Sequence, residues 1–312
     1  MGKNILVTGG AGFIGSHLCE ALLGEEHRIV IIDNFCSGHR RNVSLLEDRI
    51  TLIDGDIRVI AEHHTRIGPI DTIIHLAAMI SGYDSLSSPD EYNDVNIRGL
   101  LRVIEFAAAQ KVRRIVFASS STVYGNQSGT DLSELVLPKP LTVYALTKLA
   151  GEHLLDLYGR IHGFSHCSLR LFNVYGPRQA TDHPYANVTC KFSHSTAHRL
   201  PVCLYGDGEQ SRDFVYVHDV VRAFLAVLEG SEQTIYNVGT SKARTINDLL
   251  VALAEIGGAP LETIALPPWV NDIRSIRANI SRFTAEFGFS PVVALEQGLA
   301  DTVAYFREHP EA

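Results

Sequence analysis

Short apolar runs alternate with stretches of helical periodicity along the first half of the chain. Most of the runs are rich in Ile and Val, as is typical of buried strands. They lie at Asn4–Thr8, His27–Ile32, Thr72–His75, Arg114–Ala118 and His166–Leu171. Strands that alternate with helices predict repeated βαβ units, in which helices cover both faces of a parallel sheet. We therefore expect an α/β fold with a doubly wound parallel sheet.

The pattern is less regular in the second half of the chain, where Gly and Pro are denser. Amphipathic helical stretches follow at Thr245–Ile256 and Leu295–Phe306. We expect residues 1–171 to form a first domain and residues 172–312 a smaller α+β lobe. Segments between about 214 and 240 are expected to return to the first domain.

Composition narrows the possible partners. The net charge of −8 comes with scattered rather than clustered cations, so nucleic acid is not an expected partner. No apolar run approaches the roughly 18 residues that span a bilayer, and the first residues do not resemble a leader peptide, so we expect a cytoplasmic protein. The five cysteines lack C-x-x-C spacing, and the histidines match no ligand spacing, so we expect no metal site.

The strongest local signal is "NILVTGGAGFIGSHL". Gly9, Gly12 and Gly15 stand between a strand and a helix, where backbone can approach a pyrophosphate and the helix N-terminus faces it. Asp33 ends the second strand, where an acid accepts hydrogen bonds from a ribose and repels a 2′-phosphate. The sequence therefore predicts NAD rather than NADP, although the basic run His39–Arg41 would weaken that preference.

Two further strand ends carry weaker signals. Asp56, in "DGDIR", is placed to meet an adenine amino group, and "HLAA" at 75–78 supplies small residues beside which a cofactor can lie. Ordinary turn and packing residues have the same composition, so both interpretations stay open.

Tyr144 and Lys148, in "VYALTKLAGEHLL", are four residues apart and so share one face of the predicted helix. A lysine ammonium beside a phenol lowers the pKa of the phenol, which lets it accept a proton near neutral pH. Ser120, in "SSSTVYG" at a strand end, is expected to hydrogen-bond the same substrate hydroxyl. A surface helix is the alternative interpretation, since this spacing is common by chance.

Together these motifs resemble the extended short-chain dehydrogenase/reductases that act on nucleotide sugars, most like the UDP-glucose 4-epimerase group. The motifs are "TGGAGFIGSH" at 8–17, "DN" at 33–34, "GDIR" at 55–58, "HLAA" at 75–78, "SSSTVYG" at 119–125, "YALTK" at 144–148, "RLFNVYGPRQ" at 170–179 and "YGDGEQSRDFVYVHDV" at 205–220. The resemblance implies a Rossmann domain that binds NAD, a C-terminal lobe that binds the nucleotide sugar, and a homodimer.

The resemblance also implies roles for particular residues. The catalytic residues would be Ser120, Tyr144 and Lys148. Besides Tyr144 and Lys148, the cofactor would be bound by Gly9, Gly12, Phe13, Ile14, Asp33, Asn34, Asp56, Ile57, Leu76, Ala77 and Ala78. Besides Ser120 and Tyr144, the substrate would be bound by Ser81, Ser121, Thr122, Asn173 and Arg212, with Arg274 as a second candidate for its diphosphate. An arginine fork suits a diphosphate, and an ion pair of Arg212 with Asp213 or Asp219 is the alternative.

The residues after Ser120 narrow the reaction. The 4,6-dehydratases of the family carry Asp-Glu at the positions of Ser121 and Thr122, and the decarboxylases usually carry Glu at the second. Neither hydroxyl has a pKa suited to proton transfer at neutral pH. We therefore expect 4-epimerisation through a transient 4-keto sugar. A dehydratase or 4-ketoreductase of the same family and a non-catalytic NAD-binding protein remain as alternatives.

Three positions bear on the substrate. Tyr83, followed by Asp84, stands where glucuronate 4-epimerases often carry an arginine, which predicts an uncharged UDP-hexose. Trp269 stands where many relatives have an arginine before "GD", so its effect on diphosphate binding is open. Ile276 lies near the position that controls bulk at C2 of the sugar.

Overall fold

A seven-stranded sheet with the strand order β11-β7-β5-β4-β1-β2-β3 is the centre of the fold. Its strands in chain order are β1 (Asn4–Thr8), β2 (Arg28–Asp33), β3 (Ile50–Asp54), β4 (Thr72–His75), β5 (Arg114–Ser120), β7 (Ser165–Leu171) and β11 (Thr234–Val238). β1 pairs in parallel with both β2 and β4, so the strand order reverses beside it. In such sheets ligands bind at the carboxyl ends of the strands, at this reversal.

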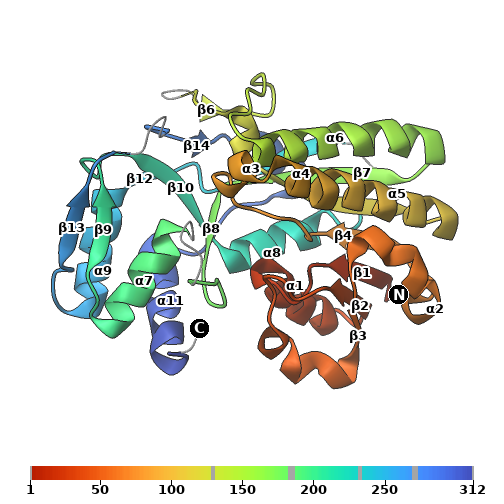
Figure 1. Cartoon of the computed structure of the whole chain (residues 1–312), viewed down its shortest axis with the longest axis horizontal. Helices are drawn as coiled ribbons and strands as arrows, with labels where there is room; N and C mark the ends of the chain where they lie inside the picture. Colours follow the sequence, from red (N-terminus) through yellow and green to blue (C-terminus); the bar gives the residue numbers. More distant parts are fainter. Residues whose placement is uncertain (1, 128–130, 182–186, 231–233, 269–272, 311–312) are drawn as a thin grey trace. The chain divides into compact units, whose positions relative to one another are not determined.

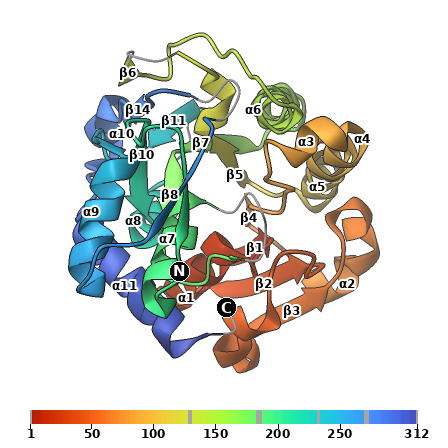
Figure 2. The ribbon, with the colours of Figure 1, turned by 60° about the vertical axis from the view of Figure 1, so that its left-hand side comes forward.

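Helices cover both faces of this sheet, as expected for a doubly wound fold (Figures 1 and 2). On one face lie α5 (Gly99–Gln110) and α6 (Val143–His162), and on the other lie α1 (Phe13–Gly24) and α8 (Val217–Ala226). Ile5, Leu6 and Val7 of β1 are completely buried, because a strand covered on both faces has no solvent-exposed side. The predicted α/β class with a Rossmann-type sheet is confirmed.

The computed structural model describes residues 2–127, 131–181, 187–230, 234–268 and 273–310. Contacts divide the chain into two units. Unit 1 comprises residues 1–123, 140–170 and 221–236, and unit 2 comprises residues 124–139, 171–220 and 237–312. Relative to the expected boundary at residue 171, the segment 124–139 thus belongs to unit 2 and the segment 221–236 to unit 1. The binding roles expected of the two parts stay predictions.

Short helices make up the rest of unit 1. They are the 3-10 helices Arg40–Asn42, Ser44–Arg49, Ile57–His63 and Ser121–Tyr124 (whose last residue falls in unit 2), the α-helices α2 (His64–Ile67), α3 (Asp84–Ser87) and α4 (Pro89–Tyr92), and the π-helix Asn93–Arg98. The π-helix continues directly into α5, so residues 89–110 form an almost unbroken helical segment.

The described residues of unit 2 contain three small sheets. They have the orders β12-β10-β8, β13-β9 and β14-β6. The strands are β6 (Asp131–Leu132), β8 (Asn173–Tyr175), β9 (Val202–Tyr205), β10 (Ser211–Tyr216), β12 (Ala243–Thr245), β13 (Thr263–Leu266) and β14 (Arg277–Ala278). The helices are α7 (Val188–His198), α9 (Ile246–Gly257), α10 (Ser281–Phe287) and α11 (Leu295–Glu308), of which α7, α9 and α11 pack together. Both amphipathic stretches predicted from the sequence are therefore helices.

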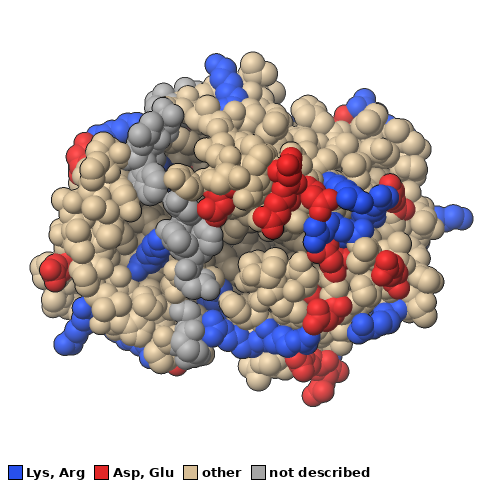
Figure 3. Space-filling model, viewed as in Figure 1, with Lys and Arg blue, Asp and Glu red and all other residues tan. Residues whose placement is uncertain are grey.

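Charged side chains of both signs are interspersed over the described part of the face in Figure 3, in keeping with the scattered cations of the sequence. Within the described residues, no helix combines the length and the apolar character needed to cross a membrane.

Candidate active site

The glycine turn between β1 and α1 is closely packed backbone. A Cβ atom on Gly9 would lie 2.7 Å from the Ala77 backbone nitrogen, and one on Gly15 would lie 2.3 Å from the Gly9 carbonyl oxygen. Gly9 also has a φ of +72°, which favours glycine. Gly12 is the N-cap of α1 and provides no side-chain cap. The first turn of α1, which includes Phe13 and Ile14, therefore presents bare backbone at its N-terminus, as a pyrophosphate requires.

Asp33 lies at the carboxyl end of β2, as predicted. Its Oδ2 accepts a hydrogen bond from the Ala11 backbone N–H and its Oδ1 accepts one from Phe35, both at 2.9 Å. Burial raises the pKa of this carboxyl, and the two backbone hydrogen bonds oppose the rise. Each carboxylate oxygen has a second lone pair, so the arrangement fits the ribose hydroxyls of NAD.

Asp56 is engaged with Arg58 and Asn34. Its Oδ1 accepts hydrogen bonds from the Arg58 backbone N–H at 2.8 Å and from Nε at 2.9 Å, while Oδ2 pairs with Nη2 at 2.7 Å. Asn34 donates to Oδ2 at 3.2 Å. The Arg58 side chain holds the pKa of Asp56 below its usual value. The carboxylate thus caps the 3-10 helix that begins at Ile57, and its contact with adenine stays a prediction.

The segment after β4 lies beside the glycine turn. The Leu76 backbone N–H donates to the Thr8 carbonyl oxygen at 3.1 Å, and the Ala77 N–H donates to the Thr8 hydroxyl at 3.3 Å. The strand therefore places Leu76, Ala77 and Ala78 at the point where the strand order reverses. This is the position from which small side chains leave room for a cofactor.

The three predicted catalytic residues meet at the end of β5. Tyr144 and Lys148 of α6 are both buried, and the Lys148 ammonium donates to the Ala118 carbonyl oxygen at 2.8 Å. The same ammonium lies 5.9 Å from the centre of the Tyr144 ring. The Ser120 side chain lies close enough to the Tyr144 phenol to lower its pKa. The structure therefore joins two elements, β5 and α6, into one polar group within unit 1.

Burial controls the protonation of this group. It raises the pKa of Tyr144 to about 12, against the effect of the Ser120 side chain, and lowers the pKa of Lys148 to about 7. The expectation that Lys148 brings the phenol pKa towards neutrality is therefore wrong for the chain by itself. Desolvation disfavours both charged forms, so near neutral pH the lysine is only partly an ammonium.

The turn after Ser120 presents hydroxyls. Thr122 donates to the Ser120 Oγ through its backbone N–H at 3.2 Å and its hydroxyl at 2.9 Å. Ser121 is buried beside it. In both bonds the Ser120 oxygen is the acceptor. The proton of the Ser120 hydroxyl therefore remains available for donation to another group.

Asn96 and Tyr92 support this site, and the sequence analysis missed both. Asn96 is buried and pairs with the Met79 backbone through both amide atoms, at 2.8 and 3.0 Å, while also donating to the Thr147 hydroxyl at 3.0 Å. The Tyr92 hydroxyl accepts a hydrogen bond from the Ser81 N–H at 3.1 Å. These partners lie far apart in the sequence, and no local pattern signals the pairing.

Unit 2 holds the other predicted substrate-binding residues. Asn173 begins β8, and Arg212 of β10 donates through Nη1 to the carbonyl oxygens of Ser211 at 2.9 Å and Ile273 at 2.6 Å. Arg274 forms a two-point ion pair with Asp207, at 2.8 and 3.0 Å. The cation of Arg274 is thus engaged by an exposed carboxylate.

The acids proposed as alternative partners of Arg212 have backbone partners of their own. Asp213 accepts hydrogen bonds from the N–H groups of residues 240, 241 and 278, and Asp219 from those of residues 292 and 293. Ile276 is buried. Trp269 lies outside the described residues.

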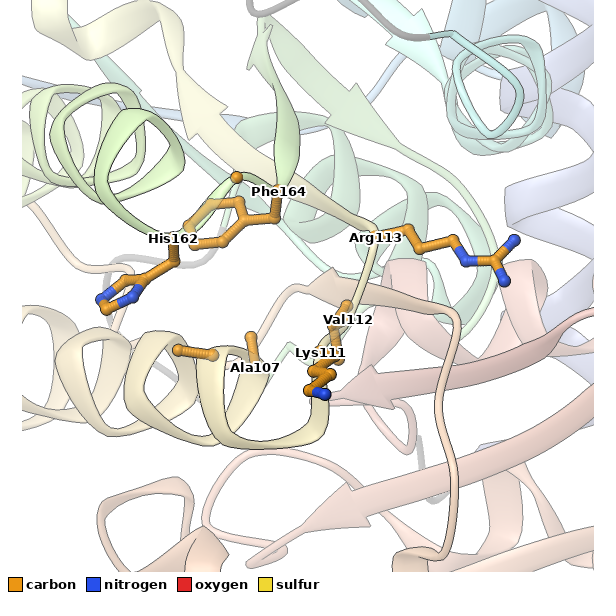
Figure 4. Close-up of a pocket in the computed structure, with 8 residues that line it drawn as sticks. Ala107, Lys111, Val112, Arg113, His162 and Phe164 are labelled. Carbon is orange, nitrogen blue, oxygen red and sulfur yellow. The ribbon is translucent and has the colours of Figure 1, made fainter.

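A separate cavity of about 450 Å³ lies at the opposite end of β5 from Ser120. Figure 4 shows His162 and Phe164 on one side of it and Ala107 and Lys111 on the other, while Arg113 extends away. It contains none of the predicted site residues. In the described parts of the chain, no group of His, Cys, Asp and Glu side chains could hold a metal ion.

Relatives match the chain over almost its whole length. A UDP-glucose 4-epimerase of Mycolicibacterium smegmatis is 36% identical, over 97% of this chain and 98% of its own. The Thermus thermophilus UDP-glucose 4-epimerase, solved with NAD, is 35% identical with a TM-score of 0.91, covering 98% of this chain and 99% of its own. The UDP-N-acetylglucosamine 4-epimerase of Methanobrevibacter ruminantium, solved with UDP-N-acetylmuramic acid, is 33% identical with a TM-score of 0.94 and the same coverage.

These matches confirm the resemblance that the motifs indicated. The family model spans both the glycine turn and the Tyr144–Lys148 helix. Asp33 and the glycine turn, which fit NAD, agree with this match. The chain belongs to the NAD dependent epimerase/dehydratase family, whose model matches residues 5–239.

Proposed function

We propose that this protein is an NAD-dependent nucleotide-sugar 4-epimerase that acts on an uncharged UDP-hexose through a transient 4-keto sugar. The observation that carries the proposal is the buried group of Ser120, Tyr144 and Lys148 at the end of β5. One phenol with a hydrogen-bonding serine is sufficient to remove a proton from a sugar hydroxyl and to return it.

The chain's own residues have distinct tasks in this proposal. The Tyr144 phenolate accepts the proton of the C4 hydroxyl, and Ser120 donates a hydrogen bond that holds the same hydroxyl in place. Lys148 binds near the nicotinamide ribose and supplies positive charge to the phenolate. NAD, when bound, would accept a hydride from the sugar and return it. Lys148 alone does not bring the phenol pKa to neutrality, and the positive nicotinamide ring would add the missing charge.

The residues after Ser120 support epimerisation over elimination of water. An elimination needs an acid and a base beside the sugar, and residues 121 and 122 supply a serine and a threonine. Hydride removal and return needs no further titratable group. Tyr83 and Asp84 in place of an arginine support an uncharged sugar.

We assign recognition of the sugar diphosphate to Asn173, Arg212 and Arg274 of unit 2. Arginine forks match phosphate oxygens, and the named relatives act on UDP-sugars. The family resemblance further leads us to expect a homodimer, which size-exclusion chromatography with light scattering would test. We also propose a cytoplasmic location, as expected from the short apolar runs of the sequence.

Product analysis tests the proposal. The purified protein is incubated with UDP-glucose, UDP-N-acetylglucosamine and UDP-glucuronate, with and without added NAD, and the products are read by mass spectrometry and proton NMR. A C4 isomer of unchanged mass from an uncharged sugar is the expected result. Loss of one water, or net reduction of a 4-keto sugar, would assign the protein to another activity of the family.

A further inference from the structure

A buried ion pair lies directly behind the candidate catalytic group. Glu152 of α6 accepts hydrogen bonds from Arg170 of β7, from Nε at 2.9 Å and from Nη2 at 2.7 Å. Both side chains are at most 3% exposed. The Glu152 Oε1 also accepts the hydroxyl of Ser119 at 2.5 Å, which adds β5 to the same network.

The network adds to the contacts between α6 and β5. Tyr144, Lys148 and Glu152 follow one another at intervals of four residues, so they form one stripe on α6. This stripe meets three consecutive residues of β5. Lys148 donates to the Ala118 carbonyl, Glu152 accepts the Ser119 hydroxyl, and Tyr144 lies near enough to Ser120 for that side chain to lower its pKa.

Stability alone is a weak reason for such a pair. Removing two charges from water is costly, and apolar side chains of similar volume usually stabilise a core at least as well. Geometric precision is a stronger reason here, because α6 lies very close to β5. A Cβ atom on Gly151 would be 2.7 Å from the Phe117 ring, so a small slide of the helix would displace its reactive side chains.

We propose that Ser119 and Glu152, held by Arg170, are positioning residues that fix α6 along β5. They determine the position of α6 along β5, and thereby the positions of Tyr144 and Lys148 relative to Ser120 and the end of the strand. The inference rests on the proposed function for the reaction that this geometry serves. None of the three residues needs to touch the substrate.

The test compares two serine-to-alanine variants of the same sheet. Ser119→Ala removes the link to Glu152 without changing any charge. Ser165→Ala is the matched control, because Ser165 lies at the other end of β7 and accepts a hydrogen bond from the buried Arg114 at 3.1 Å. We expect Ser119→Ala to lower kcat about tenfold, with KM changed less than about twofold, and Ser165→Ala to lower neither by more than about twofold.

A second readout does not depend on turnover. The ultraviolet absorbance of the Tyr144 phenolate is titrated with pH in each variant at saturating NAD, with the matching NAD-loaded Tyr144→Phe double variant subtracted as background. Ser119→Ala should move the midpoint to higher pH, because it shifts Tyr144 away from the Ser120 side chain that lowers the phenol pKa. Ser165→Ala should leave the midpoint unchanged.

The outcomes separate this inference from the proposed function. If the unmodified protein converts no nucleotide sugar, the proposed function fails and the titration still decides the inference. If Ser119→Ala and Ser165→Ala give the same kcat and the same titration midpoint, the positioning role is overturned. Arg170→Lys is the second variant, since it keeps the cation but loses the fork to Glu152, and it should reproduce both effects of Ser119→Ala.

Discussion

The polar groups at the end of β5 in unit 1 are buried, whereas the Arg274–Asp207 ion pair of unit 2 is exposed to solvent. Tyr144 and Lys148 are buried, and desolvation shifts the pKa of each towards its neutral form. Arg274 and Asp207 are both 58% exposed, and Arg274 lowers the pKa of Asp207 to about 2. Proton transfer gains from fixed, desolvated groups, whereas an exposed ion pair can exchange partners at small cost. The two regions should therefore respond differently to substitution.

The largest effect is expected at the buried phenol. Tyr144→Phe removes the only proposed proton acceptor, so kcat should fall by about 10³-fold or more while the protein stays folded. Tyr124→Phe is the matched control, because that buried hydroxyl donates to Asn237 at 2.7 Å. The control should lower the melting temperature and keep kcat within about threefold. Equal losses in the two variants would contradict a catalytic role for Tyr144.

The two arginines assigned to the diphosphate should act on binding rather than on turnover. Arg212→Met and Arg274→Met should each raise KM for the UDP-sugar about 10- to 100-fold and leave kcat almost unchanged. Arg277→Met offers a control, since Arg277 is an exposed arginine of unit 2 that pairs with Asp131 through Nε at 2.7 Å. Its KM should not change. A drop in kcat without a change in KM would place the two arginines outside diphosphate recognition.

Stability should depend on pH through Lys148. Its pKa falls from 10.5 to about 7 on burial, so between these values the unfolded chain holds a proton that the folded chain lacks. The Lys148 contribution to the free energy of unfolding therefore rises with pH across this window, and the penalty is fully present below pH 7. Lys148→Met removes a penalty of at most about 5 kcal/mol, reduced by the lost hydrogen bond to Ala118.

Melting curves from pH 6 to pH 10 measure this effect. The gain in melting temperature from Lys148→Met should be largest at pH 6 and should shrink as the pH rises. Lys139→Met, at an exposed lysine, is the control and should give no such trend. A gain that is constant with pH would show that the Lys148 amine does not lose its proton in this window.

The smallest effect is expected at Asp207, which competes with the sugar diphosphate for Arg274. Asp207→Asn weakens the hold on Arg274, so KM for the UDP-sugar should fall about two- to threefold. The corresponding change at Asp131, the partner of Arg277, should have no effect on KM. A higher KM in Asp207→Asn would mean that the pair orients Arg274 rather than competing for it.

The sequence predicts elements whose signal is local. Asn4–Thr8 and Thr72–His75 are strands at the predicted residues, because continuous apolar runs specify a strand buried on both faces. β5 extends past Ala118 to Ser120, although serines indicate a loop. Ser119 lies in the strand, and its hydroxyl donates to Glu152, 33 residues away. Such partners, like that of Asn96, are set by tertiary structure, which local patterns do not record.

The phenol pKa shows the same limit. The spacing of Tyr144 and Lys148 predicts that they lie together, as they do. It carries no information on how completely they are buried, and burial raises the pKa of Tyr144 and lowers that of Lys148.

Turnover in deuterium oxide tests the central claim most directly. If the hydrogen at C4 leaves as a hydride and returns to the same sugar, UDP-glucose should give its C4 epimer with no deuterium at C4 by NMR and mass spectrometry. Deuterium at C4 of the product would mean that the hydrogen leaves as a proton, and a product lighter by one water would mean elimination. Either result would contradict the account of Tyr144 as the sole base of a hydride-returning 4-epimerase.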